Sequence, residues 1–318
     1  EHHKAQAKQA VPALKKSIEL SEPGFAPEAQ GLLAEALLSS GELEESQEAF
    51  RAAMNTPLKD DPGWHSRLAA GFGRVSLKLG QLETAIAALQ EAALANPQNA
   101  VIQRDLSDAF LAQGLEEEAL AAARHALNMD PAGLDTLVWF AGQTRRFKST
   151  RSDAKILQRE AVQAWQQASQ LAPERGDVLV CLANAYLQSG DREAARGALE
   201  LVRAAVNDEL PESRPGIHLD TKDVHQAARM LQDLGEDAGA IFLLQSAVQK
   251  LQSAAEASST APEEQAALMG DLAAMQAETG LLREALASVE AGLRLAPDQP
   301  RRRRLCSRWA TVCVPRRL

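Results

Sequence analysis

A repeat of 34 residues is the feature that most constrains what this chain can fold into. Across residues 66–133, small, apolar and turn residues recur at that interval, as Gly80 and Gly114 do. The same interval separates Phe72 from Leu106, Ala85 from Ala119, Ala92 from Ala126, and Pro97 from Pro131. A repeat of this length encodes one supersecondary unit that cannot bury its apolar face alone, so neighbouring copies must stack. We therefore predict an array of stacked units.

The spacing inside each unit predicts two antiparallel helices. Small residues face each other where the two helix backbones approach, as Gly73 and Ala85 do in the second whole unit. Glycine closes the first helix in a left-handed conformation, and proline stops the second helix before the next begins. Alanine and leucine dominate the composition and aromatic residues make up only 4%. An all-α fold is therefore expected.

The predicted organisation is an array with short irregular insertions. Residues 1–26 form an N-terminal half repeat, and residues 27–300 form the array. The units lie near 27–55, 66–99, 100–133, 134–175, 176–207, 221–252 and 266–299. Gly235 and Gly280 each follow the previous turn glycine by 45 residues, and not by the 34 residues of the regular repeat. The surplus residues in each of these two units are expected to form a loop or to extend a helix. The basic tail at 301–318 is not expected to fold with the array, and its alternative role is that of an arm for an acidic partner.

The repeated residues resemble those of the tetratricopeptide repeat (TPR) family. The motif residues are Leu106, Ser107, Phe110, Gly114, Ala119, Ala126 and Pro131, and they recur as Leu182, Ala183, Tyr186, Gly190 and Ala195. The large aromatic residue often found near the start of the TPR unit is absent, because Ala69, Gln103 and Leu179 stand there. The resemblance covers roughly residues 9–297. It implies a right-handed α-solenoid of about seven helix pairs plus the half unit, with the first helices lining a concave groove.

The resemblance also implies which residues point into that groove. They are Arg67, Arg74, Lys78, Arg104, Asp108, Arg145, Asn184, Gln188, Lys222, His225 and Arg229. This surface is more basic than the acidic body, which favours an acidic or carboxylate-bearing peptide as ligand. In the alternative, Glu35, Arg74 and Asp108 pair with one another across adjacent helices. The lysine and asparagine of TPRs that bind chaperone tails are replaced by Ala70 and Arg74, so that activity is not supported. Trp139 and Trp165 are expected to pack inside their units.

Charge and motif content exclude several function classes. The formal net charge is −9, and residues 301–318 carry seven arginines and no acid, which leaves 27 basic against 43 acidic residues before them. Such a body is not suited to general binding of nucleic acid or anionic membrane. The three cysteines and six histidines have no metal-ligand spacing, and no phosphate loop or nucleophile motif occurs. We predict no enzyme activity, no metal and no cofactor.

The leading functional hypothesis is a non-enzymatic scaffold that binds a partner peptide or helix in the groove. The chain lacks an initial methionine and begins on a half unit, so it is interpreted as a fragment. The alternative is therefore a regulatory or sensor segment of a larger enzyme or transcription regulator. Self-association through terminal helices is a third hypothesis, because neither end shows a polar cap. The expected location is cytoplasmic.

Overall fold

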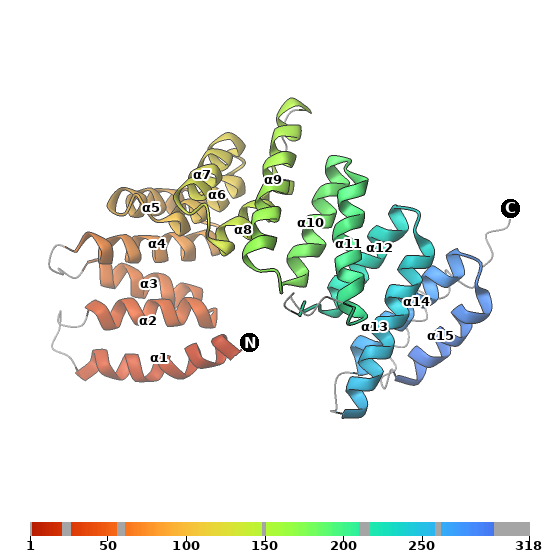
Figure 1. Cartoon of the computed structure of the whole chain (residues 1–318). Coiled ribbons are helices and arrows are strands. Elements are labelled where there is room, and N and C mark those ends of the chain that lie inside the picture. The colour runs from red at the N-terminus through yellow and green to blue at the C-terminus, as the bar shows by residue number, and fades with distance from the viewer. Residues whose placement is uncertain are drawn as a thin grey trace. The chain divides into compact units, whose positions relative to one another are not determined.

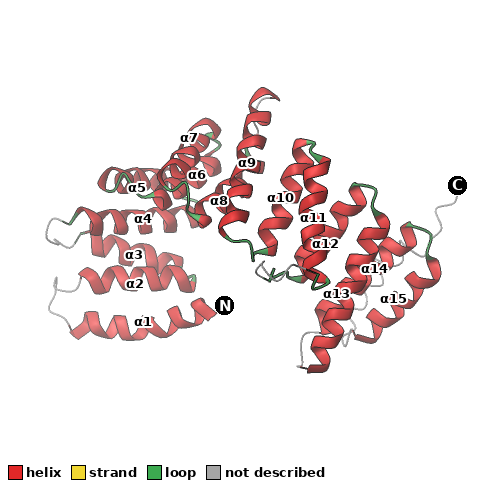
Figure 2. Cartoon of the chain, in the orientation of Figure 1, coloured by secondary structure: helices red, strands yellow, loops and turns green. Residues whose placement is uncertain are grey.

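The computed structural model describes residues 2–20, 27–55, 61–147, 151–209, 216–257 and 262–295 (Figure 1). Over these ranges it contains fifteen α-helices and one short 3-10 helix, and no β-strand (Figure 2). An isolated bridge between Arg175 and His218 is the one β-type contact in the described ranges. The prediction of an all-α fold built from helix pairs is confirmed.

The first compact unit comprises residues 1–150. Its helices are α1 (His2–Leu20), α2 (Pro27–Ser40), α3 (Leu43–Met54), α4 (Pro62–Lys78), α5 (Leu82–Ala95), α6 (Ala100–Gln113), α7 (Glu116–Met129), α8 (Leu134–Gln143) and the 3-10 helix η1 (Thr144–Arg146). Each α-helix packs on the next along the chain. The first helices of successive pairs, α2, α4, α6 and α8, also contact one another, whereas α3, α5 and α7 do not pack closely together. The first helices therefore form the inner layer of this unit.

The second compact unit comprises residues 151–318. Its described helices are α9 (Arg151–Leu171), α10 (Gly176–Ser189), α11 (Arg192–Val206), α12 (Thr221–Asp233), α13 (Asp237–Ala257), α14 (Pro262–Glu278) and α15 (Leu282–Leu295). Here α10 contacts α12 and α12 contacts α14, but α11 also contacts α13. The units divide between residues 150 and 151, inside the range predicted for the fourth repeat. The predicted repeat ranges therefore stay a prediction.

Left-handed glycines close the first helices, as the sequence predicts. Six turn glycines have positive φ: Gly41, Gly80, Gly114, Gly190, Gly235 and Gly280. At Gly114, where φ is 84°, the backbone N–H of Gly114 donates to Leu111 O and that of Leu115 donates to Phe110 O. These bonds satisfy carbonyls that the end of a helix otherwise leaves unpaired. An L-residue with a side chain is strained in this conformation, which explains why glycine recurs there.

Small residues hold the paired helices close together in the first unit. A Cβ atom at Gly73 would lie 2.6 Å from Leu89 Cγ and 3.1 Å from Ala85 O, and one at Gly71 would lie 2.3 Å from the ring of Phe50. Phe50 itself is fully buried. The predicted close approach between Gly73 and Ala85 is therefore present.

The two surplus segments have different structures. Residues 216–220 run without helix, and His218 is bonded on both sides, since its N–H donates to Glu174 O at 2.8 Å and its carbonyl accepts from the Gly176 N–H at 2.9 Å. A Cβ at Gly176 would lie 2.4 Å from that carbonyl oxygen, so this contact requires glycine. The other surplus lengthens α13 to Ala257. The insertion at 56–60 and the tail at 301–318 lie outside the described residues.

Candidate functional site

The inner layer of the first unit carries Arg67 in a bidentate ion pair. Arg67 Nε donates to Glu35 Oε1 at 2.7 Å, and Arg67 Nη2 donates to Glu35 Oε2 at 2.8 Å. This hydrogen bonding raises the pKa of Arg67. The guanidinium also lies 5.6 Å from the ring centroid of Trp64. The charge of Arg67 is therefore compensated within the protein.

Arg74 and Asp105 form a looser pair between α4 and α6. Arg74 Nη1 lies 3.7 Å from Asp105 Oδ2, and neither that oxygen nor Arg74 Nε has a hydrogen-bond partner among the described residues, although both atoms are buried. Burial raises the pKa of Asp105 to about 6, against the opposing attraction of Arg74. Burying a carboxylate in this way costs free energy, because the loose ion pair does not replace the hydrogen bonds to water that the carboxylate loses on folding.

Asp108 and Arg104 are also engaged with a neighbouring first helix. Asp108 Oδ1 accepts from Arg146 Nη1 and from Gln143 Nε2, each at 3.1 Å. The Arg104 guanidinium lies 5.3 Å from the ring centroid of Trp139, a cation–π distance. Trp139 is only partly buried. The prediction that it packs inside its own unit therefore does not account for its contact with Arg104.

Two further predicted cations in this unit are exposed. Lys78, at the end of α4, forms no ion pair with any described residue. Arg145 lies in η1 and has interactions within the structure, so it is not a free cation.

The ion pairs differ from those the sequence predicted. Pairing across adjacent first helices is present, but the predicted partners are wrong: Glu35 pairs with Arg67, Arg74 with Asp105, and Asp108 with Arg146. The reason is geometric, because the side chain that lies opposite on the next helix is not the one exactly one repeat away. Sequence reasoning missed Asp105 and Gln143. Nothing in the sequence joins Arg146 to Asp108, because the two residues are 38 positions apart.

The second unit gathers three of the predicted groove residues in one pocket. Lys222, His225 and Arg229 lie on one face of α12, because positions three and seven residues apart align along a helix. The pocket between α12 and α14 has a volume of about 460 Å³ and is lined by Thr221, Lys222, His225, Gln226, Arg229, Ala267, Leu268 and Asp271. On α10, the predicted residues Asn184 and Gln188 bond to each other, with 2.9 Å between Gln188 Nε2 and Asn184 Oδ1.

The charges around this pocket are only partly compensated. His225 Nδ1 contacts the carboxylate of Asp271, and both side chains are largely buried. Lys222 and Arg229 are exposed, and neither forms an ion pair with a side chain that the structure describes. Ala267 is exposed and supplies an apolar wall, whereas Leu268 is only 2% exposed. The pocket therefore offers two available cations beside an aliphatic surface. Asp271 is the pocket residue that sequence reasoning missed.

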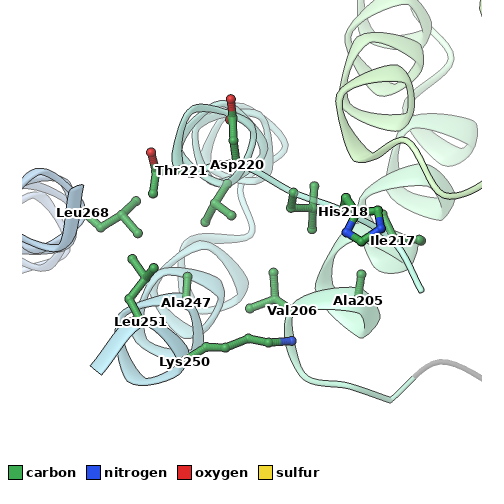
Figure 3. A pocket seen from close by; sticks show the side chains of 12 residues that line it. Ala205, Val206, Ile217, His218, Asp220, Thr221, Ala247, Lys250, Leu251 and Leu268 are labelled. Carbon is green, nitrogen blue, oxygen red and sulfur yellow. The ribbon is translucent and has the colours of Figure 1, made fainter. Parts of the chain in front are cut away.

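A smaller pocket of about 280 Å³ lies between α11, α12 and α13 (Figure 3). Its walls are mainly aliphatic, with Val206, Ile217 and Leu251 among them. The ammonium of Lys250 lies 2.6 Å from Asp208 Oδ1. The cation of this pocket is thus already neutralised, which distinguishes it from the pocket between α12 and α14.

The described residues are informative about metal sites and membrane-spanning helices. They contain no cluster of three or more histidine, cysteine or acidic side chains arranged to hold a metal ion. Within the same ranges, no helix is both long enough and apolar enough to cross a bilayer.

Comparison with known proteins agrees with the helix-pair architecture. Residues 71–133 match the family model described as tetratricopeptide repeat. The TPR repeat-containing protein YpiA of Bacillus subtilis is 27% identical over 126 residues, which are 40% of this chain and 28% of YpiA. This chain thus spans less than a third of that curated relative.

A solved structure shares the fold at low sequence identity. The C-terminal part of a TPR repeat-containing protein from Cytophaga hutchinsonii has a TM-score of 0.54 at 14% identity, over 77% of this chain and 90% of that one. A structure of Pseudomonas aeruginosa pilF has a TM-score of 0.49 at 15% identity, over 72% of this chain and 97% of that one. The family match over residues 71–133, the repeated helix pairs and the left-handed turn glycines together support tetratricopeptide repeats in this chain.

Proposed function

We propose that this chain is a non-catalytic scaffold that binds an acidic peptide of a partner protein in the pocket between α12 and α14. The observation that carries the proposal is the pair of uncompensated cations, Lys222 and Arg229, at the pocket. On an acidic protein, exposed cations that find no internal partner are available to an anionic ligand. The exposed Ala267 would contact the apolar part of the ligand.

The spacing of the two cations sets the ligand that fits best. Lys222 and Arg229 are seven residues apart on one helix, which corresponds to about 10 Å along its axis. An extended peptide in the polyproline II conformation has three residues per turn and advances about 3.1 Å per residue, so two carboxylates three residues apart lie on one face about 9 Å apart. We therefore expect a preference for peptides with Asp or Glu at positions i and i+3.

Charge reversal of the two cations tests the proposal. In the Lys222→Glu/Arg229→Glu variant, an extended peptide with two glutamates three residues apart should bind about 100-fold more weakly, because two attractions become repulsions. Binding is measured by fluorescence anisotropy with a labelled peptide, and a peptide with glutamines in place of the glutamates serves as the ligand control.

A matched variant controls for the overall change in charge. Lys155 and Arg159 are exposed on α9 and are four residues apart, so Lys155→Glu/Arg159→Glu changes the net charge equally without touching the pocket. This variant should keep most of the affinity. Equal losses in both variants would show that general charge, and not the pocket, attracts the peptide.

The alternative hypothesis of a regulatory or sensor segment of a larger enzyme or transcription regulator stays a prediction. It concerns what is joined to the scaffold and names no ligand. The proposed peptide binding applies in either setting.

A further inference from the structure

The last described helix carries an apolar stripe whose leucines Leu282 and Leu286 are exposed. Leu282 is 59% exposed and Leu286 is 53% exposed, and both lie on the same face of α15 as the half-buried Val289 and Leu293. This face differs from the one that packs inside the unit, where Ala285 and Gly292 are buried and Leu295 contacts the core. α15 therefore has two apolar faces, and one of them contacts water.

Equivalent positions on other second helices are buried. Gly80 and Gly280 both close a first helix with positive φ, which aligns α5 with α15. In α5, the residue equivalent to Leu286 is Ile86, which is 9% exposed, and the residue equivalent to Val289 is Leu89, which is fully buried. Ile86 and Leu89 share a core cluster with Ile102 and Leu106 of the next first helix.

The same arrangement holds in α13, which follows Gly235. There Ile241, Leu244 and Val248 are buried in one cluster with Leu268 and Leu272 of α14. The exposed stripe of α15 is thus a stacking surface that other second helices cover with a neighbouring helix. An exposed apolar stripe of this kind marks an interaction site.

We infer that this stripe pairs with α15 of a second copy of the chain, as an antiparallel helix pair about a two-fold axis. With the axis opposite residues 287 and 288, Leu282 lies beside Leu293 of the second copy, and Leu286 lies beside Val289 of the second copy. A two-fold contact needs a surface that complements itself, and this stripe meets that condition because a residue near one end faces one near the other end.

The charges beside the stripe favour the same pairing. Arg283 and Glu290 flank one edge of the stripe, both are exposed, and neither forms an ion pair with a described residue. In the antiparallel arrangement, Arg283 of each copy lies within one helical turn of Glu290 of the other. Two reciprocal ion pairs therefore accompany the apolar contact, whereas a parallel two-fold arrangement would put these charged edges of the two copies on opposite sides of the contact and form neither pair.

A size measurement on the 318-residue chain tests the inference. Light scattering and sedimentation over a concentration series should show a dimer, and Leu286→Glu should convert it to a monomer because the substitution buries a charge in the contact. The matched control is Leu94→Glu, at a leucine that is 83% exposed on α5 and away from this stripe. That variant should remain a dimer.

Charge exchange then tests the orientation. Arg283→Glu alone and Glu290→Arg alone should each weaken dimerisation by about tenfold or more, because each creates two like-charge contacts. Mixing the two single variants should restore a mixed dimer, since every contact then joins opposite charges.

Several outcomes would overturn the inference. One is a wild-type chain that stays monomeric at all concentrations, as expected if residues 296–318 of the same chain cover the stripe. Others are an assembly that Leu286→Glu leaves intact and two single variants that do not pair when mixed. The pocket variant Lys222→Glu/Arg229→Glu should dimerise normally, so failure of the peptide-binding proposal is distinguishable from failure of this one.

Discussion

Basic residues on the first helices of the two units differ in whether an acidic side chain nearby pairs with them. In residues 1–150, ion pairs join successive first helices at Glu35–Arg67 and at Arg74–Asp105. A third ion pair, Asp108–Arg146, joins α6 to η1. In residues 151–318, Lys222 and Arg229 flank a pocket and have no described carboxylate partner. The comparison shows that a basic residue on the inner face of a repeat is not by itself a ligand contact. What matters is whether the neighbouring helix supplies an acid.

The packing of the two units differs as well. Close contact in the first unit depends on Gly71 and Gly73, where a Cβ would meet Phe50 or Leu89. In the second unit a large cluster includes Leu199, Val202, Leu243 and Leu244, all fully buried. The first unit thus combines tight backbone approach with large buried rings such as Phe50 and Phe140, whereas the buried cluster of the second unit consists of aliphatic side chains and methionines.

The largest expected effect concerns Asp105 and the cost of burying its charge. Since the pKa of Asp105 is raised to about 6, its ionisation opposes folding. Its contribution to stability is most favourable below about pH 4 and is lost as the pH rises to about 6, by up to about 3 kcal/mol. Asp105→Asn should therefore stabilise the chain at pH 7.5, and the difference from wild type should disappear near pH 4. Urea unfolding at several pH values measures this.

A less stable Asp105→Asn variant at pH 7.5 would contradict this expectation. It would mean that the ion pair with Arg74 outweighs the cost of burial. Asp208→Asn is a suitable control, because that side chain is 78% exposed and its substitution should change the free energy of unfolding little.

The next effect concerns ligand binding in the two units. Arg67→Glu/Arg104→Glu changes the charge of the first unit as much as Lys222→Glu/Arg229→Glu changes that of the second. Because Arg67 is held by Glu35 and Arg104 by Trp139, the first-unit variant should weaken acidic-peptide binding by less than about threefold, against about 100-fold in the second unit. Circular dichroism checks that both variants stay helical. A larger loss in the first-unit variant would move the binding site to that unit.

Packing in the first unit should be sensitive to one methyl group. Gly71→Ala should destabilise the chain by about 1–3 kcal/mol, since the new Cβ overlaps the buried ring of Phe50. Gly197→Ala in α11 is the control, because a Cβ there meets nothing within 4 Å. The control should stabilise its helix by up to about 1 kcal/mol. Chemical denaturation of both variants measures the difference, and equal effects would contradict the proposed contrast in packing.

The smallest expected effect is the coupling between Glu35 and Arg67. Both side chains are partly exposed, so a double-mutant cycle with Glu35→Ala and Arg67→Ala should give a coupling of about 0.2–1 kcal/mol. The coupling should decrease at high salt. A value near zero at low salt would show that the pair orders the inner layer without stabilising it.

The sequence by itself determined the elements of this protein. The 34-residue interval, the turn glycines and the small residues at Gly73 and Ala85 predict the helix pairs, since local backbone conformation and close helix approach depend on residues a few positions apart. The face of α12 that carries Lys222, His225 and Arg229 was predictable for the same reason, because helical spacing alone aligns them.

Only the tertiary structure decided which of the predicted groove residues remain available to a ligand. Helical periodicity states which side chains share a face, but it does not state what lies opposite them. Arg67 and Arg229 have the same predicted role, yet Glu35 neutralises Arg67, whereas Arg229 lies beside a pocket. That difference depends on the register between neighbouring helices, which is set by packing over the whole interface and is not encoded at any single repeat position.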